Sequence, residues 1–282
     1  MIKREDIRIR DPFILTDREN GCYYMYTSTD KVSAELSALP LGVAAYKTSD
    51  LENFEEPVSV MDLSGIQGFW ADRDVWAPEV HKYKDSYYLF VSLKSGDRAR
   101  GTQIFRAESP LGKFMPISEF PVTPENWESL DGTLYVEDGK PYMIFCHEWV
   151  QISDGTICAV ELEKDLSAPV GKPFVLFAAS ENPHISELCL KGGRKGIITD
   201  GPYPYLEDGK LKMIWSSFKD GRYVIIGAQS DGGIKGTWTH TPPIYDFDGG
   251  HAMIFYSLEG KRKISLHSPN YGKLERAVFL DF

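Results

Sequence analysis

Three aspartates stand at equivalent points of a repeated pattern. Asp11, Asp131 and Asp200 each precede a proline or a glycine, and a short apolar run follows each one. If the runs are strands that meet around one axis, the three carboxylates face a common space. Like charges held close together are costly and shift one another's pKa values. That cost is usually retained for general acid–base chemistry or for a cation.

A fourth carboxylate belongs to the same part of the chain. The stretch 131–149, DGTLYVEDGKPYMIFCHEW, alternates apolar and polar residues on both sides of Asp138-Gly139, which is typical of a β-hairpin. Because the two strands are antiparallel, Glu148 and its neighbour His147 should emerge at the same end of the sheet as Asp131. The alternative interpretation is an ordinary exposed strand end.

The elements that must position these residues form an internal repeat. Hairpins like the one at 131–149 begin near residues 10, 76, 200 and 249. All but the last are followed by a third apolar segment, at 43–46, 103–106, 157–160 and 224–228. Five repeats of three or four strands predict an all-β fold, a five-bladed β-propeller, in one domain over residues 1–282. The alternative is a β-sandwich with accidental internal similarity.

Aromatic and basic residues near the predicted strand starts are candidates for ligand contact. Trp70 and Trp76 flank Arg73, Trp215 lies on a return strand, and His251 follows two glycines that let the backbone approach the axis. Aromatic residues make up 13% of the chain, which suits β-sheet and also suits stacking on sugar rings. The alternative for the tryptophans is packing between blades.

Composition excludes several classes of partner. The net charge of −10 offers no basic stripe for nucleic acid. The sequence contains no run of 18 apolar residues, so no membrane span is predicted. The first ten residues contain no apolar core of a signal peptide. We therefore expect a cytoplasmic protein, or a secreted one whose signal was removed. The four cysteines have no metal-binding spacing and are expected to be small buried apolar residues.

The ordered set of motifs resembles glycoside hydrolase family 43 over essentially the whole chain. The motifs are DPFIL with Asp11, WAPEV from Trp76, DGTLYVEDGKPY with Asp131, the DGP segment at Asp200, and GGHAMIF with His251. The resemblance implies a five-bladed propeller and inverting hydrolysis of α-L-arabinofuranosides, β-D-xylosides or similar sugars in oligosaccharides. It assigns the general base to Asp11, and to Asp131 the raising of the acid's pKa.

The general acid is where this chain departs from the family pattern. The family's usual acid is the Glu of an EGP motif, and Asp200 stands at that position here. Aspartate is one methylene shorter, so either Asp200 is the acid with a closer substrate, or Glu148 or Glu187 has taken the role. This chemistry requires no metal, although His251 could hold a Ca²⁺ or Na⁺ ion near the axis.

Two other functions fit the same fold. A glycoside phosphorylase would need basic groups for phosphate, and Arg10, Arg73, His147 and His251 are candidates. A non-catalytic carbohydrate-binding propeller would not need three axial aspartates. The sequence leaves open which sugar is bound and which end of the chain closes the ring. Long loops at 36–73 and 178–199 favour a pocket as the shape of the site.

Overall fold

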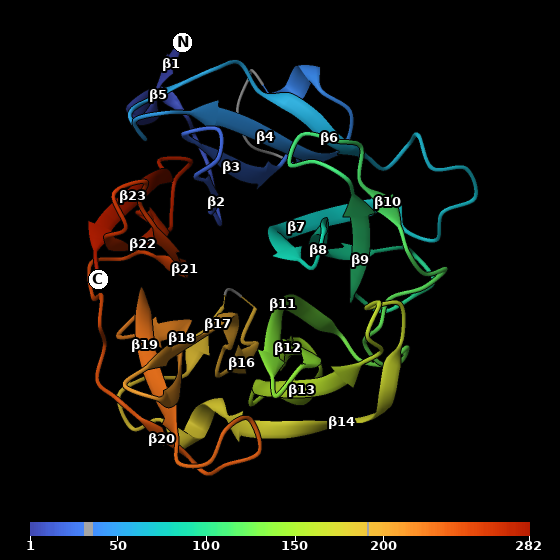
Figure 1. Ribbon diagram of the computed structural model, residues 1–282. Helices are drawn as coiled ribbons and strands as arrows, with labels where there is room; N and C mark the ends of the chain where they lie inside the picture. Colours follow the sequence, from blue (N-terminus) through green and yellow to red (C-terminus); the bar gives the residue numbers. More distant parts are fainter. Residues whose placement is uncertain (31–35, 191) are drawn as a thin grey trace.

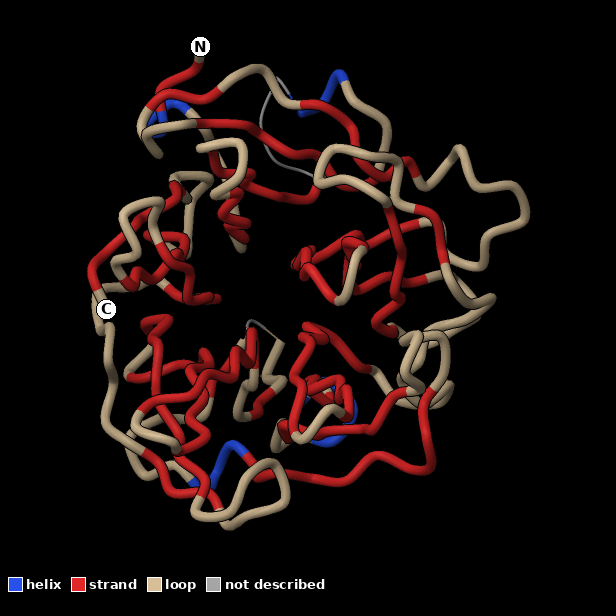
Figure 2. Tube along the Cα trace, viewed as in Figure 1, coloured by secondary structure: helices blue, strands red, loops and turns tan. Residues whose placement is uncertain are grey.

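The computed structural model describes residues 1–30, 36–190 and 192–282. Five antiparallel sheets stand around a central axis like the blades of a propeller, in chain order (Figure 1). Strands dominate the trace and helices are confined to short turns (Figure 2). The predicted all-β, five-bladed propeller is therefore confirmed.

Each blade begins with the strand nearest the axis and proceeds outward. The innermost strands are β2 (Phe13–Asp17), β7 (Arg73–Tyr83), β11 (Ser129–Glu137), β17 (Asp200–Glu207) and β21 (Gly250–Tyr256). The second strands are β3 (Cys22–Ser28), β8 (Ser86–Lys94), β12 (Lys140–His147), β18 (Lys210–Lys219) and β22 (Arg262–Ser268). The third strands are β4 (Gly42–Thr48), β9 (Gly101–Ala107), β13 (Thr156–Leu162), β19 (Arg222–Ser230) and β23 (Arg276–Asp281). The four predicted third segments all fall in these strands.

The outer edges and connections use shorter elements. The outer strands are β1 (Ile2–Lys3), β5 (Asn53–Phe54) and β6 (Val58–Asp62) in blade one, β10 (Met115–Pro116) in blade two, β14 (Pro169–Ala178) in blade three and β20 (Trp238–His240) in blade four. A separate hairpin pairs β15 (Leu188–Cys189) with β16 (Lys195–Gly196). The helical turns are η1 (Arg4–Asp6), η2 (Leu36–Ala38), α1 (Trp149–Ile152) and η3 (Ala179–Glu181). Much of the predicted long loop 36–73 is therefore strand.

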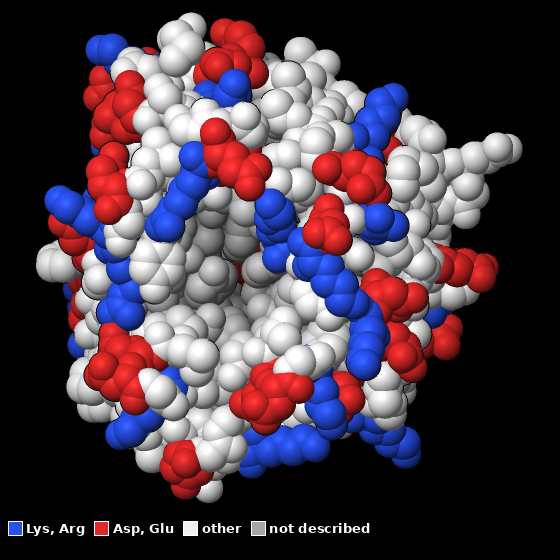
Figure 3. Space-filling model, viewed as in Figure 1, with Lys and Arg blue, Asp and Glu red and all other residues white. Residues whose placement is uncertain are grey.

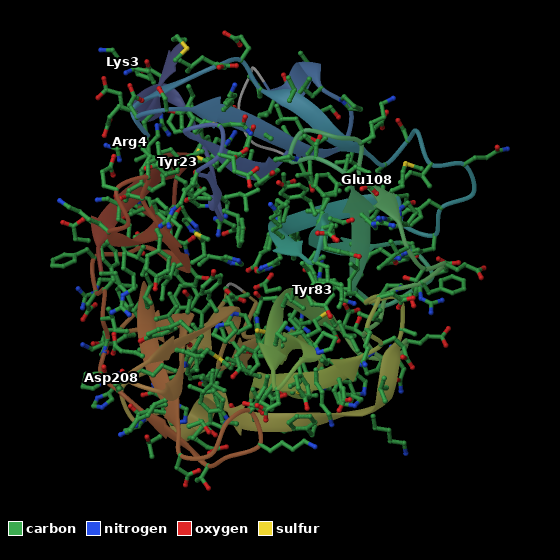
Figure 4. The ribbon with its side chains drawn as sticks, in the orientation of Figure 1. Lys3, Arg4, Tyr23, Tyr83, Glu108 and Asp208 are labelled. Atoms are coloured by element: carbon green, nitrogen blue, oxygen red, sulfur yellow. The ribbon has the colours of Figure 1, made fainter. Side chains whose placement is uncertain are left out.

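Both ends of the chain take part in closing the ring. Strand β23 completes blade five, and β1 pairs with β5 in blade one. Between them, Arg8 forms a β-bridge with Arg276, and the Ile9 N–H donates to the Glu275 carbonyl over 3.2 Å. Tyr23, labelled in Figure 4, lies at the same junction, where its hydroxyl accepts from the Leu258 N–H at 2.7 Å. The seam between blades one and five thus joins the two ends of the sequence.

The core lies between neighbouring blades, so the middle strands are apolar on both faces. Met213, Ile214 and Trp215 in β18 are fully buried in succession. Trp215 packs against Phe177 from blade three with ring centroids 5.5 Å apart. Each such side chain contributes about 1.5–3 kcal/mol by leaving water. Packing between blades therefore fixes their relative positions, and with them the ends of the innermost strands.

One backbone feature recurs where each innermost strand begins. Five residues there have a positive φ: Asp11 (50°), Ala77 (45°), Asp131 (56°), Gly201 (50°) and His251 (52°). In blades two to five the pairing with the second strand shifts at this point, for example between Leu130 and Thr133. In blades two to five the innermost strand thus has a bulge near its start, and bulges re-aim side chains.

This register corrects one sequence interpretation. Asp11 and Asp131 are equivalent, because each is the positive-φ residue at the start of the innermost strand of its blade. Asp200 is one residue earlier, since Gly201 occupies that position in blade four. Asp200 pairs with Ser216 just as Leu130 pairs with Cys146. The prediction that all three aspartates are equivalent is therefore wrong for Asp200, although all three lie at strand starts.

Gly201 is expected to tolerate no side chain. A Cβ there would lie 3.0 Å from the His251 ring in addition to the strain of its positive φ. Gly139 also has a positive φ, but a Cβ there meets nothing within 4 Å. Both Gly→Ala changes share the backbone cost of about 1–2 kcal/mol. We expect Gly201→Ala to cost at least about 1 kcal/mol more than Gly139→Ala. Thermal unfolding of the two variants checks this, and equal melting temperatures would contradict it.

Candidate active site

A cavity of about 550 Å³ opens where the innermost strands begin. Figure 3 shows that the molecule is hollowed at the centre of the ring on the face turned to the viewer, with Lys and Arg side chains along parts of the rim. Seven of the residues singled out from the sequence line it: Arg10, Asp11, Trp76, Asp131, Glu148, Asp200 and His251. They come from all five blades, so the cavity exists only in the closed ring.

Asp11 lies just before β2, and two histidines of blade five face it. Its Oδ1 is 3.4 Å from His251 Nδ1 and 3.1 Å from His267 Nδ1. Burial by itself would raise the pKa of Asp11, but His251, His267 and Arg10 outweigh it and hold that pKa well below the ordinary value. Asp11 is therefore ionised at neutral pH, as a general base requires.

Asp131 is held in the bulge of β11 by its neighbours in blades two and four. Its N–H donates to Ser92 Oγ at 2.8 Å, and its Oδ2 accepts the Gly201 N–H at 2.9 Å. Burial raises the pKa of Asp131 well above the ordinary value. The Gly201 N–H opposes this rise, and the nearby carboxylates Asp11, Glu79 and Glu148 add to it.

Asp200 begins β17 beside a buried phenol. Its Oδ2 accepts the Tyr223 hydroxyl proton at 3.0 Å. Burial raises the pKa of Asp200 to about 7, and the Asp131 charge adds to this, against His251 and Tyr223 which lower it. Asp200 is thus protonated in a large fraction of molecules near neutral pH, as a general acid requires.

Asp131 and Asp200 are best considered as a coupled pair. Each raises the other's cost of ionisation, so the pair retains a proton at a pH where an exposed aspartate is fully ionised. Asp11, which has the two histidines beside it, carries the negative charge. One cavity therefore contains a carboxylate and a carboxylic acid at the same pH.

Glu148 lies in the same cavity but in a different environment. It is 8% exposed, and its Oε2 is 3.6 Å from Arg100 Nε, with no hydrogen-bond partner among the described residues. Burial raises the pKa of Glu148, whereas Arg100 lowers it. The Arg100 guanidinium also lies 3.6 Å from the ring centre of Trp76, a residue that is 37% exposed. Trp76 is thereby held as an aromatic platform at the cavity wall, within β7 rather than before it as the sequence suggested.

Four other sequence candidates lie outside the lining of this cavity. Trp215 is fully buried, so the prediction that it contacts substrate is wrong. His147 is 9% exposed, stacks on Trp127 at 4.2 Å and contacts Gln151 at 2.7 Å. Trp70 donates its indole N–H to Gln103, and Arg73 is paired with Asp72 at 2.7 Å. Two of the four basic groups considered for phosphate, Arg73 and His147, therefore do not line the cavity that contains the carboxylates.

The remaining sequence expectations have mixed outcomes. Glu187 is 51% exposed and pairs with Lys195, and it does not line the cavity. Leu188, Leu190 and Ile198 of the predicted loop 178–199 do line it, while residue 191 lies outside the described residues. Cys189 is exposed, so the expectation of four buried cysteines is wrong for it.

Metal-ligand clusters and membrane-crossing helices are both absent from residues 1–30, 36–190 and 192–282. There, no three or more His, Cys, Asp and Glu side chains gather in a way that could hold a metal ion. The suggested Ca²⁺ or Na⁺ ion beside His251 stays a prediction. In the same ranges, no helix has the length and apolar character needed to cross a membrane.

Three residues that act on the carboxylates were not assigned that role from the sequence. Tyr223 and His267 contact Asp200 and Asp11 directly, and Arg10 lies close enough to lower the pKa of Asp11. Arg10 had been considered only as a phosphate ligand. The signal for Arg10 was its place beside Asp11, but nothing in the local sequence distinguishes Tyr223 from a core tyrosine.

Comparisons with known proteins agree with the fold. The family model described as glycosyl hydrolases family 43 matches residues 6–281. A solved endo-arabinase from Bacteroides thetaiotaomicron is 38% identical, with a TM-score of 0.91 over 100% of this chain and 96% of that one. An endo-1,4-beta-xylanase from the same organism is 21% identical, with a TM-score of 0.77 over 99% of this chain and 92% of that one.

A curated relative matches over a shorter region. Xylosidase/arabinosidase 43A of Humicola insolens is 25% identical over 138 residues. This region is 46% of the present chain and 41% of the relative, so the match spans about two fifths of the relative's length.

Proposed function

Because the chain belongs to glycosyl hydrolase family 43, we propose that it is an inverting glycoside hydrolase acting on arabinan- or xylan-type oligosaccharides. One feature carries the proposal: Asp11 and Asp200 face one cavity, and their surroundings shift their pKa values in opposite directions. Inverting hydrolysis needs this pair, a carboxylate to activate water and a carboxylic acid to protonate the leaving oxygen.

The proposed mechanism assigns each carboxyl group one role. Asp11 takes a proton from water as that water attacks the anomeric carbon, and His251 beside it stabilises its charge beforehand. Asp200 gives its proton to the glycosidic oxygen, so the bond to the leaving sugar breaks as the bond to water forms. Tyr223 then donates a hydrogen bond to the carboxylate that Asp200 becomes. Asp131 keeps Asp200 protonated beforehand through its charge.

The remaining cavity residues bind the sugar in this proposal. Trp76 offers its ring for stacking, and Glu148, which lines the cavity, offers its carboxylate to sugar hydroxyls. Arg100 contacts both side chains and holds them in place. Arabinofuranosyl bonds are the first substrates to test, because the similar Bacteroides protein with 38% identity is an endo-arabinase.

The test is a substrate screen that measures sugar release, its dependence on phosphate and the anomeric configuration of the product. Nitrophenyl α-L-arabinofuranoside, nitrophenyl β-D-xyloside, linear arabino-oligosaccharides and xylo-oligosaccharides are incubated with the protein, with and without inorganic phosphate. We expect phosphate-independent release of sugar from the arabinose series, with the opposite anomer appearing first by NMR. Retention of the anomeric configuration would contradict inversion, and a phosphate requirement would make the protein a phosphorylase. Binding without any release would make it a carbohydrate-binding propeller.

A further inference from the structure

Hydrogen bonds between neighbouring blades repeat around the axis. In three blades the N–H of the positive-φ residue at the start of the innermost strand donates to a side chain on the second strand of the preceding blade. Asp131 donates to Ser92 at 2.8 Å, His251 to Ser216 at 2.8 Å, and Asp11 to His267 Nδ1 at 3.2 Å. These three acceptors occupy equivalent positions, because each one pairs with the residue just before the positive-φ residue of its own blade.

Blade three departs from this pattern. The residue equivalent to Ser92, Ser216 and His267 is Cys146, which pairs with Leu130 and is fully buried. Sulfur is a weak hydrogen-bond acceptor. The bulge N–H of the next blade, that of Gly201, donates instead to Oδ2 of Asp131 at 2.9 Å. The one place where the acceptor is a thiol is thus the one where a backbone N–H reaches a candidate catalytic carboxylate.

We propose that Cys146 is a positioning residue for the acid–base reaction. Because the Cys146 thiol is a weak acceptor, the Gly201 N–H donates to Asp131 instead. This hydrogen bond holds in place the Asp131 carboxylate, which keeps Asp200 protonated. The inference rests on the proposed function and adds a residue to it. A hydroxyl at this position would repeat the arrangement of the three blades described above and take the N–H away from Asp131.

The charged groups around the Asp131–Asp200 pair come from several elements. Asp11 and Arg10 precede β2, Glu79 lies on β7, Glu148 follows β12, Tyr223 lies on β19 and His251 lies on β21. Cys146 is the residue of β12 that both aspartates affect, since after burial their charges are the next causes that raise the pKa of its thiol. The thiol therefore remains protonated and neutral beside them.

The direction of the expected change follows from the Gly201 hydrogen bond. That bond favours the ionised form of Asp131, and ionised Asp131 keeps the proton on Asp200. If the bond is lost, the shared proton moves from Asp200 toward Asp131. Asp200 is then deprotonated at a lower pH, so activity is lost earlier as the pH rises.

The experiment compares Cys146→Ser with Cys146→Ala. In kcat/KM against pH on an arabino-oligosaccharide, we expect the serine variant to move the basic limb down by about one pH unit. The alanine variant offers no acceptor, so its basic limb should stay at the wild-type pH. An unmoved limb in the serine variant, or equal shifts in both variants, would overturn the proposal.

Two further readouts separate this proposal from simpler failures. A destabilised fold lowers the active fraction at every pH without moving the limb, and circular dichroism melting of both variants measures it. The amide proton shift of Gly201, followed by NMR, should titrate with the aspartates in the wild type and not in the serine variant. This measurement needs no turnover, so an inactive wild type would disprove the proposed hydrolase while leaving the role of Cys146 testable.

Discussion

Replacing Asp11 with asparagine is expected to lower kcat/KM on the best glycoside by roughly 10²–10⁴-fold. The amide cannot take a proton from the attacking water. The fold should survive, because asparagine tolerates the positive φ of 50° at this position and keeps the size of aspartate. Steady-state kinetics and thermal unfolding of the purified variant measure the two effects.

A matched control is available at the turn between β11 and β12. Asp138 also has a φ of 50°, and it is exposed and remote from the cavity. Asp138→Asn therefore repeats the chemical change and the backbone conformation without touching the site. Wild-type turnover by Asp11→Asn would show that Asp11 is not the base, whereas equal losses in both variants would show an indirect effect.

Replacing Asp200 with alanine is expected to have an effect that depends on the leaving group. A natural oligosaccharide needs its leaving oxygen protonated, so its turnover should fall by roughly 10²–10⁴-fold. A dinitrophenyl glycoside needs little protonation and should lose far less. Wild-type kcat/KM should fall as the pH rises through about 7, the pKa of Asp200, because the acid loses its proton there. This basic limb should be absent in Asp200→Ala.

Glu148→Ala must be compared with Asp200→Ala to establish which residue is the general acid. Glu148 is buried beside Arg100 and lines the same cavity, and burial raises its pKa as well. As a sugar-binding residue it should raise KM on both kinds of substrate and leave the basic limb in place. If Glu148→Ala instead spares the dinitrophenyl glycoside and removes the limb, and Asp200→Ala is impaired equally on both substrates, the two roles are exchanged.

The architecture was predictable because the repeat has both a period and an internal order. Alternating apolar residues around turns such as Asp138-Gly139 mark hairpins, and five of them in one chain predict blades. The position of β23 in blade five was not predictable. It depends on which segment pairs with the edge of β22, and both ends of the chain have suitable apolar residues.

The site was predictable to within one residue of register. The motifs located Asp11, Asp131 and Asp200 at strand starts, but the bulge that sets Asp200 apart leaves no trace in the apolar pattern. Trp215 shows the same limit. The local sequence around a tryptophan near a strand end does not distinguish a side chain that faces the cavity from one that faces the core. The Tyr223 contact joins two strands of blade four and depends on the register of that blade.

The seam between blades one and five has a consequence for how an active molecule is made. The contact of Asp11 with His267 joins residues 256 positions apart, and it forms across the joint that closes the ring. Closing so long a loop costs entropy that local blade contacts do not repay, so we expect this joint to be among the last to assemble. Four blades can then be in place while Asp11 still lacks His251 and His267. Recovery of turnover after refolding would accordingly report closure of the ring, and would lag behind the far-ultraviolet signal of strand formation.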